Sequence, residues 1–381
     1  MRGMSFASWF TAALVALSPA FAADVPSEEV RVAKLPPATP YRVYLTDFAI
    51  NHVVDGRLYV IDGDALKLDG MIATGFAGLP TLAPDRSELY VATTYYPRLS
   101  RGERTDVVDI YDAATLAWKA EVVIPPKHAQ ALAYRGVIRP SADGRFVFVQ
   151  NATPASSVTI VDVKARKFVA EVPTPGCWII LPAASLASRF STLCGDGTVL
   201  TVTLDDEGKP KSQKKSDQFF DPDGDPLFVQ AESIGDRYFF ISFKGMVHPA
   251  NLGGEQATFE APWSLIAGPD AKGWRPGGYQ PLALHEGSGR IFVAMHAKGK
   301  DGSHKDPATQ IWAYDLATQK RVARAPGNNA IAIAVSRNAQ PRLFAIDGLK
   351  MALAVYDADR KLLFRRRMEN VAEAGTLLEL H

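Results

Sequence analysis

The 381-residue chain lacks the short motifs that would give it catalytic chemistry of its own. It has no glycine loop ending in Gly-Lys-Ser/Thr, no strand-to-helix Gly-x-Gly-x-x-Gly, no His-Glu-x-x-His and no Cys-x-x-Cys. A serine nucleophile elbow is missing too. The seven histidines are scattered, with no pair at the spacing of two helical metal ligands. These absences argue against the common nucleotide-binding enzymes and zinc hydrolases.

The chain also lacks an excess of charge of either sign. Its 42 basic and 41 acidic residues leave a formal charge of +1, which is too balanced for electrostatic capture of nucleic acid or of an anionic membrane. Apolar residues make up 47% of the sequence, so a sizeable core can be buried. Proteins and small molecules are therefore the expected partners.

Long hydrophobic runs are absent, and the one near the N-terminus has the pattern of a secretory signal. Arg2 supplies the positive end, Phe6–Leu17 is apolar, and Ala20–Ala22 offers a small-x-small cleavage site. We expect residues 1–22 to be a signal peptide, with an uncleaved anchor as the alternative. Residues 23–40, rich in Pro, Glu and Ala, are expected to form an extended arm.

Cysteine is scarce, since the chain has only Cys177 and Cys194. An exported protein meets an oxidising compartment, where two nearby thiols tend to pair. A disulfide closing a loop of this size would contribute about 3 kcal/mol. The alternatives are a metal pair or a catalytic thiol, but no histidine lies between Val161 and Ala231 to complete a metal site.

What the chain does have is a repeated sequence pattern: a Gly/Asp/Ser turn, an apolar strand, a gap and a second strand. The clearest copies begin at Asp143–Arg145 and at Ser288–Arg290. Weaker copies begin near Arg57, Glu88, Arg189, Arg237 and Arg342. Strand pairs that return at this spacing are typical of radially or linearly stacked sheets.

The repeats predict an all-β fold, a seven-bladed β-propeller of four-stranded antiparallel sheets that forms a single domain over residues 41–381. Six or eight blades remain alternatives, because two of the repeats are degenerate. The seven units cover Arg42–Thr74, Leu79–Ile124, Gly136–Val172, Trp178–Lys215, Leu227–Trp263, Pro281–Ala325 and Ala330–Met368.

Three insertions interrupt the strand pattern, at residues 95–105, 268–279 and 296–307. Loops on a rigid scaffold often carry binding sites, although each of these can equally be a plain surface connection. The acidic run Asp221–Asp225 is expected to be a turn between strands. A calcium loop would need glycine where Pro226 stands.

Several irregular segments, more than the strands, form a recognisable set: Thr93–Tyr96, Arg101–Val108, Gln150–Ala155, Gly176–Trp178, Cys194–Gly197, Trp274–Tyr279, His304–Lys305 and Arg321–Arg324. Together they resemble the heavy subunit of the quinoprotein amine dehydrogenases. The resemblance extends from about Arg42 to the C-terminus and looks closer to the aromatic amine type than to the methylamine type.

The resemblance implies a periplasmic heavy subunit, without a cofactor or a metal of its own, in an α2β2 assembly. The light subunit of that family carries tryptophan tryptophylquinone, which converts primary amines to aldehyde and ammonia. The electrons pass to a cupredoxin, azurin or amicyanin. No catalytic residue is expected in this chain, which would scaffold the light subunit and wall part of the substrate channel.

The resemblance implies roles for only a few individual residues. The family places an aromatic residue at the mouth of the substrate channel, and the matching stretch here makes Phe48, Ile50 and Asn51 the channel candidates, with Ile50 at the aligned position. The candidates for contact with the light subunit lie in two of the insertions: Tyr95, Arg98, Arg101, Arg104, Trp274 and Tyr279.

A second functional reading stays open on the sequence alone. An exported propeller without a partner could be a lactonase-type hydrolase or a platform for protein interactions. A lactonase would need metal ligands or a general base facing the channel, and the scattered histidines form no visible set.

Overall fold

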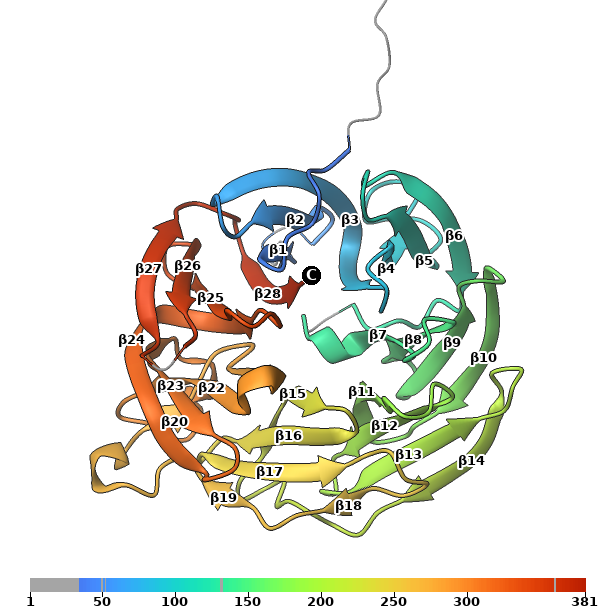
Figure 1. Cartoon of the computed structure of the whole chain (residues 1–381). Coiled ribbons are helices and arrows are strands. Elements are labelled where there is room, and N and C mark those ends of the chain that lie inside the picture. The colour runs from blue at the N-terminus through green and yellow to red at the C-terminus, as the bar shows by residue number, and fades with distance from the viewer. Residues whose placement is uncertain (1–33, 49–50, 52, 131–132, 360) are drawn as a thin grey trace, which may run out of the picture. The chain divides into compact units, whose positions relative to one another are not determined.

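Antiparallel β-strands make up nearly all the regular structure in the computed structural model, which describes residues 34–48, 51, 53–130, 133–359 and 361–381 (Figure 1). The helices of this part are single 3₁₀ turns: η1 (Arg135–Val137), η2 (Pro269–Ala271), η3 (Glu286–Ser288) and η4 (Ser303–Lys305). None of the helices in these ranges has the length and apolar character to cross a membrane.

The first sheet joins the two ends of the described chain. Its strand order is β28-β1-β2-β3-β4-β5-β6, and Val43 of β1 lies opposite Leu380 of β28. The strands are β1 (Arg42–Asp47), β2 (Gly56–Asp62), β3 (Lys67–Leu82), β4 (Glu88–Tyr95), β5 (Thr105–Asp112), β6 (Trp118–Ile124) and β28 (Gly375–Leu380).

The next sheets each hold four main strands in chain order. Residues 138–264 fold as β7-β8-β9-β10, β11-β12-β13-β14 and β15-β16-β17-β18, with β19 pairing β17. Their bounds are β7 (Ile138–Pro140), β8 (Phe146–Asn151), β9 (Ser157–Asp162), β10 (Lys167–Pro173), β11 (Cys177–Pro182), β12 (Arg189–Cys194), β13 (Val199–Leu204), β14 (Pro210–Lys215), β15 (Leu227–Ile234), β16 (Arg237–Ser242), β17 (Met246–Asn251), β18 (Thr258–Phe259) and β19 (Trp263–Ser264).

The last sheet contains eight strands in the order β20-β22-β23-β24-β25-β26-β27, with β21 pairing β22. Its strands are β20 (Arg275–Pro276), β21 (Leu282–His285), β22 (Arg290–His296), β23 (Ala308–Asp315), β24 (Lys320–Val335), β25 (Arg342–Asp347), β26 (Ala352–Asp357) and β27 (Leu363–Met368).

Two 16-residue strands each belong to two groups of strands. The first part of β3 pairs with β2 as far as Gly75, and its second part pairs with β4 from Phe76. In the same way β24 pairs first with β23 and then, from Ala330, with β25. The chain thus passes from the outer edge of one group to the inner edge of the next without a break.

The sheets stand around a common centre within residues 34–381, as Figure 1 shows. We call β7, β11, β15, β21, β28 and the second halves of β3 and β24 the inner strands. The Gln280 amide donates to Ile333 O and to Leu378 O, both at 3.0 Å, and so ties two of these strands together. The expected all-β fold of four-stranded antiparallel sheets is confirmed, and the arrangement is consistent with a β-propeller.

The backbone conformation of the tight turns explains why glycine returns in the repeated sequence pattern. Gly144 and Gly289 adopt φ values of +68° and +60°, which are strained for residues with a Cβ. In the first turn the Asp143 carboxylate accepts a hydrogen bond from Arg145 N at 3.0 Å. Each turn therefore starts the strand that follows it at a fixed register.

Apolar side chains fill the space between neighbouring sheets. Phe148 of β8 and Phe190 of β12 come from different sheets, and their ring centroids lie 4.9 Å apart. Each is nearly inaccessible to solvent, and burying such a ring contributes about 1.5–3 kcal/mol. The core is thus built from one face of each sheet packed on the next.

The expected signal peptide, residues 1–22, and most of the expected arm lie outside the described residues. The described end of the arm runs over 34–40 without a strand. Leu35 N donates to Ala114 O at 2.8 Å, and the Leu35 side chain packs against the apolar cluster of β1, β2, β3 and β4. The proposed division into signal, arm and domain stays a prediction.

Candidate functional site

The connections that the sequence singled out all leave the same edge of the sheets. Within each group of four strands, neighbouring strands run in opposite directions. The loop between the second and third strands therefore lies at the same end of the sheet as the loop that leads from the fourth strand to the inner strand of the next group. We call the described residues of 48–55, 96–104, 125–130, 265–281 and 297–307 the loop face. Contacts support this grouping: Arg104 Nη2 donates to His128 O at 2.9 Å and Gly278 N donates to His304 O at 3.0 Å.

The channel candidates follow β1 on this face. Phe48 is only 5% exposed and belongs to the largest apolar cluster, against which Val53 and Phe76 pack. Asn51 is exposed, and Ile50 lies outside the described residues. The assignment of these three residues to a substrate channel stays a prediction.

The connection between β4 and β5 carries four of the contact candidates and sorts them into a tip and a base. Arg98 and Arg101 are exposed and pair with each other at the tip, where Arg98 N donates to Arg101 O at 3.1 Å. Between them Leu99 is 80% exposed. The tip thus presents an apolar side chain flanked by two cations.

At the base of this loop, Tyr95 and Arg104 are engaged within the chain. The Tyr95 hydroxyl donates to Asp109 Oδ2 at 2.5 Å, and burial together with this carboxylate raises the pKa of Tyr95. Arg104 donates from Nε and Nη2 to the two oxygens of Asp106, at 2.7 and 2.6 Å, and also to His128 O. These two side chains fix the loop on the sheet.

Asp106 is the centre of a buried polar network that no sequence motif indicated. Besides Arg104, it accepts hydrogen bonds from Thr94 Oγ1 at 2.7 Å and from His128 N at 3.0 Å, and His128 Nδ1 lies 3.1 Å away. Burial alone would raise the pKa of Asp106, but the hydrogen bonds from His128 and Arg104 outweigh it and hold the pKa below its usual range. The carboxylate therefore stays ionised and joins β4, β5 and the connection after β6.

Trp274 and Tyr279 lie on the long connection between β19 and β21. Both side chains are half-buried. The Trp274 ring lies 5.0 Å from that of Trp312, and Lys305 Nζ stands 5.6 Å from the centroid of the Tyr279 ring. Each aromatic residue therefore has one face packed on the sheet and part of its surface open.

Glycines allow this connection to approach the next inner strand. Gly278 has φ +114°, and a Cβ there would meet Ile331 O at 2.6 Å. Tyr279 N then donates to Ile331 O at 2.6 Å. The sequence Trp274–Tyr279 thus needs its glycines to hold the two aromatic residues in place.

The predicted disulfide between Cys177 and Cys194 is confirmed. It links β11 to β12 at directly opposed positions, with 3.9 Å between the Cα atoms. Next to it, Gly195 N donates to Gly176 O at 2.9 Å. The bond fastens the start of an inner strand to the end of its neighbour, at the same edge as the loop face.

The acidic run Asp221–Asp225 uses Asp221 within its own turn and Asp225 to hold the end of β16 and the turn that follows it. Asp221 Oδ1 accepts from Asp223 N and Gly224 N, and Asp225 accepts from Ser242 Oγ at 2.7 Å and from Lys244 N at 2.8 Å. Over the described ranges no three His, Cys, Asp or Glu side chains are grouped so as to hold a metal ion.

Comparison with known proteins identifies the family. The sequence profile of the methylamine dehydrogenase heavy chain family matches residues 39–377. The methylamine dehydrogenase heavy chain of Methylobacillus flagellatus is 29% identical over 91% of this chain and 90% of that protein. The corresponding heavy chain of Methylorubrum extorquens is 28% identical over 91% of this chain and 85% of that protein.

Solved structures share the fold at low sequence identity. A putative 6-phosphogluconolactonase from Bacteroides fragilis is 9% identical, with a TM-score of 0.62 over 91% of this chain and 98% of that one. A dihydro-heme d1 dehydrogenase is 16% identical, with a TM-score of 0.56 over 90% of this chain and 76% of that one. At these identities the likeness concerns the fold alone. The family match over residues 39–377 decides the identity, and the chain belongs to the methylamine dehydrogenase heavy chain family.

Proposed function

We propose that this chain is the heavy subunit of a periplasmic quinoprotein amine dehydrogenase, which converts primary amines to aldehyde and ammonia. The family match over most of the chain is the observation that carries the proposal. The chain would act by binding a light subunit and by forming part of the wall of the substrate channel. Its membership of a heavy-chain family supports a light-chain partner.

We infer further that the sheets form seven blades. Dividing β3 at Gly75–Phe76 and β24 near Ala330 yields seven groups of four main strands, in which β28 completes the first group. Pairing of the last strand with the first would then close the ring and remove an exposed sheet edge.

The loop face is the proposed docking surface for the light subunit. Its tip at Arg98–Arg101 offers Leu99 as an apolar anchor between two guanidinium groups, and Trp274 and Tyr279 offer partly exposed rings on the connection between β19 and β21. Aromatic residues and arginine are enriched at the energetic centres of protein interfaces. Tyr95 and Arg104 would contribute by holding the loop in place.

The redox chemistry of the proposed assembly belongs to the partner. Tryptophan tryptophylquinone in the light subunit would accept the electrons of the amine, and a cupredoxin such as azurin or amicyanin would remove them. This chain would bind neither quinone nor metal. Phe48, Ile50 and Asn51 would line the entrance to the substrate channel, and export would depend on the signal in residues 1–22.

Co-expression with a quinone-bearing light subunit from the same genome tests the proposal. We expect the two chains to purify together and to reduce an artificial electron acceptor only when a primary amine is added. The heavy chain alone should show no such activity. Failure to bind the light subunit, or turnover of lactones by the isolated chain, would contradict the proposal.

Comparing amines in the same assay addresses the substrate class. Tests of methylamine, longer alkylamines and aromatic amines should rank them by kcat/KM. Preference for aromatic amines is the expectation that follows from the resemblance of the loops. A preference for methylamine would show that this chain shares the substrate in the name of its relatives, despite the resemblance of its loops to the aromatic amine type.

A further inference from the structure

A second polar site lies at the opposite end of the inner strands from the loop face. A cavity of about 280 Å³ is lined by residues that follow β3, β7, β11, β15 and β24, among them Pro84, Ala142, Ala184, Gly235 and Arg337. These five positions come after the last residue of an inner strand, whereas the loop face holds the links that lead into the inner strands and those between the second and third strands of a group. The cavity is therefore distinct from the proposed docking surface.

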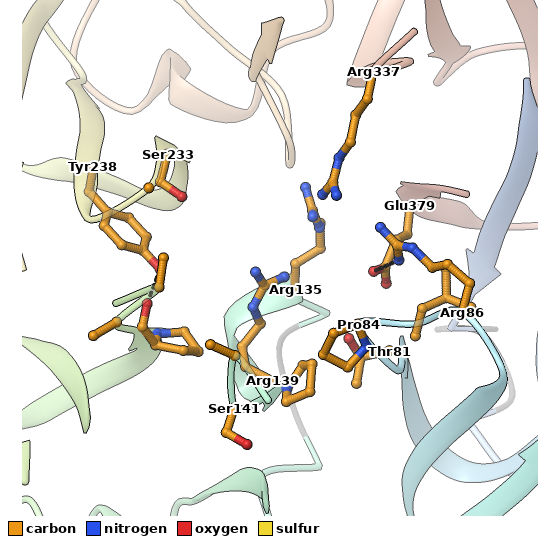
Figure 2. A pocket seen from close by; sticks show the side chains of 17 residues that line it. Thr81, Pro84, Arg86, Arg135, Arg139, Ser141, Ser233, Tyr238, Arg337 and Glu379 are labelled. Carbon is orange, nitrogen blue, oxygen red and sulfur yellow. Dashed lines mark hydrogen bonds and ion pairs between the residues drawn. The ribbon is translucent and has the colours of Figure 1, made fainter. Parts of the chain in front are cut away.

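Arginine dominates the charge of this cavity. Arg86, Arg135, Arg139 and Arg337 line it, and Figure 2 shows their side chains directed toward the same open space. The carboxylate on the lining is Glu379, and Glu232 stands just beyond it as the partner of Arg135.

Each of the two carboxylates forms an ion pair with one arginine. Arg86 Nη1 lies 3.4 Å from Glu379 Oε1, and Arg135 Nη1 lies 2.8 Å from Glu232 Oε1. Four guanidinium groups thus face two carboxylates, which leaves an excess of two positive charges around the cavity. No neighbour on the lining offsets this excess, because its remaining side chains are uncharged.

The unmatched groups are Arg139 and Arg337. Within the part of the chain that the structure describes, neither side chain makes a hydrogen bond or an ion pair. Partial burial, followed by the charge of Arg135, lowers the pKa of Arg139, and desolvation with the charges of Arg86 and Arg135 lowers the pKa of Arg337, whose side chain keeps part of its surface open to solvent. Arg135 Nε is also buried without an acceptor.

Such a cluster is costly in an unliganded protein. Arg135 Nε is buried without an acceptor, whereas the Arg139 side chain is half-buried and that of Arg337 is exposed. The four guanidinium groups repel one another, and arginine stays protonated even so. A guanidinium presents a planar set of N–H donors that matches the paired oxygens of a carboxylate or an oxyanion. An anion in the cavity would satisfy the free donors and neutralise the excess charge together.

We propose that this cavity binds a small dianion, an inorganic oxyanion or a dicarboxylate, held between Arg139 and Arg337 with Arg135 Nε as a further donor. The site belongs to the heavy chain alone and requires neither the light subunit nor the amine. Its ligand would bridge the inner ends of several sheets and so stabilise the ring.

Calorimetric titration of the purified full-length chain tests this proposal. Phosphate, sulfate and succinate serve as probes, each at ionic strength matched with sodium chloride. We expect at least one of them to bind at one site and to raise Tm, and the comparison of oxyanions with succinate identifies the class. Equal effects of chloride, or no binding of any of the three, would overturn the proposal.

Two variants locate the site. Arg139→Gln and Arg337→Gln should each weaken binding of the best probe by about tenfold or more, the loss expected for a charge-assisted hydrogen bond. Without anion each should unfold at a Tm no lower than that of the wild type, because repulsion is relieved. The matched control Arg365→Gln removes an exposed arginine that pairs with Asp357 on the outer strands, and it should bind like the wild type. Wild-type affinity in both cavity variants would refute the assignment.

A crystal of the wild-type protein soaked in selenate gives a readout that does not depend on any variant. The anomalous selenium signal should lie within hydrogen-bond distance of Arg139 and Arg337. A cavity without that signal, in a crystal grown free of competing phosphate and sulfate, would contradict the proposal. Because the isolated heavy chain is used throughout, failure here leaves the proposed amine dehydrogenase role to its own test.

Discussion

Replacing Asp106 with asparagine should expose how much the loop face depends on one buried carboxylate. Asp106 is inaccessible to solvent and receives donors from Thr94, Arg104 and His128. Asparagine has nearly the same shape, but one of its two positions becomes an NH₂ group. That group would face the N–H donors of Arg104 or His128 instead of accepting from them.

The expected loss of stability follows from these contacts. Removing one partner of a buried ion pair costs about 3–5 kcal/mol. The Arg104 side chain is 23% exposed and can recover part of its hydration, so we expect the lower end, about 3 kcal/mol. With an unfolding entropy of about 2.1 cal/mol/K per residue over the unit 34–381, this loss corresponds to a Tm decrease of about 4 °C.

The same substitution makes a prediction about pH. The pKa of Asp106 is lower in the folded protein than its ordinary value of 3.8, so its ionised form favours folding. This stabilisation is fully present above the unfolded pKa and is lost as the pH falls below it toward the folded pKa. The stability difference between the wild type and Asp106→Asn should thus be constant from about pH 8 to pH 5 and shrink below about pH 4.

Urea denaturation of the two proteins at several pH values measures both effects. Asp301→Asn is a matched control, since Asp301 also pairs with an arginine, at 2.9 Å from Arg275, but is 94% exposed. The control should unfold like the wild type. Asp106→Asn with unchanged stability at pH 7, or a stability gap that persists undiminished to pH 3, would refute the reasoning.

The remaining predictions concern the proposed interface, the disulfide and the channel. Leu99→Asp should weaken light-subunit binding by about tenfold or more in a titration, while the matched Leu186→Asp between β11 and β12 leaves it unchanged; equal effects would argue against the loop face. Cys177→Ser with Cys194→Ser should lower the free energy of unfolding by about 3 kcal/mol, because the bond closes a loop with a sequence separation of 17, and reduction of the wild type should give the same denaturation midpoint. Ile50→Phe should change the ratio of kcat/KM between short and aromatic amines without affecting assembly, and constant ratios would place Ile50 outside the channel.

The strand repeats were predictable because turn chemistry and strand pattern agree locally. Asp143–Arg145 leads into β8 and Ser288–Arg290 into β22, as expected from a left-handed glycine before an apolar run. The continuity of β3 and β24 across two groups was not predictable, since glycine at Gly75 and Gly327 looks like a break in the sequence. The pairing of β28 with β1 joins residues at opposite ends of the chain and leaves no local signal.

The candidate site was predictable only in part, and for the same reason. The loops could be singled out because they interrupt the strand pattern. Their internal roles could not, because Arg104 differs from Arg98 and Arg101 only through its contacts with Asp106 and His128. The arginine cavity combines residues from distant parts of the sequence, and nothing in the neighbourhood of Arg139 or Arg337 distinguishes them from surface arginines.

Isolation of the native protein from its source is the most direct test of the central claim, that this chain is the heavy subunit of an amine dehydrogenase. Native mass spectrometry should find two copies of it with two copies of a small quinone-bearing chain, and the assembly should transfer electrons from a primary amine to an acceptor. A lone monomer without quinone absorbance and without amine-dependent electron transfer would contradict the claim.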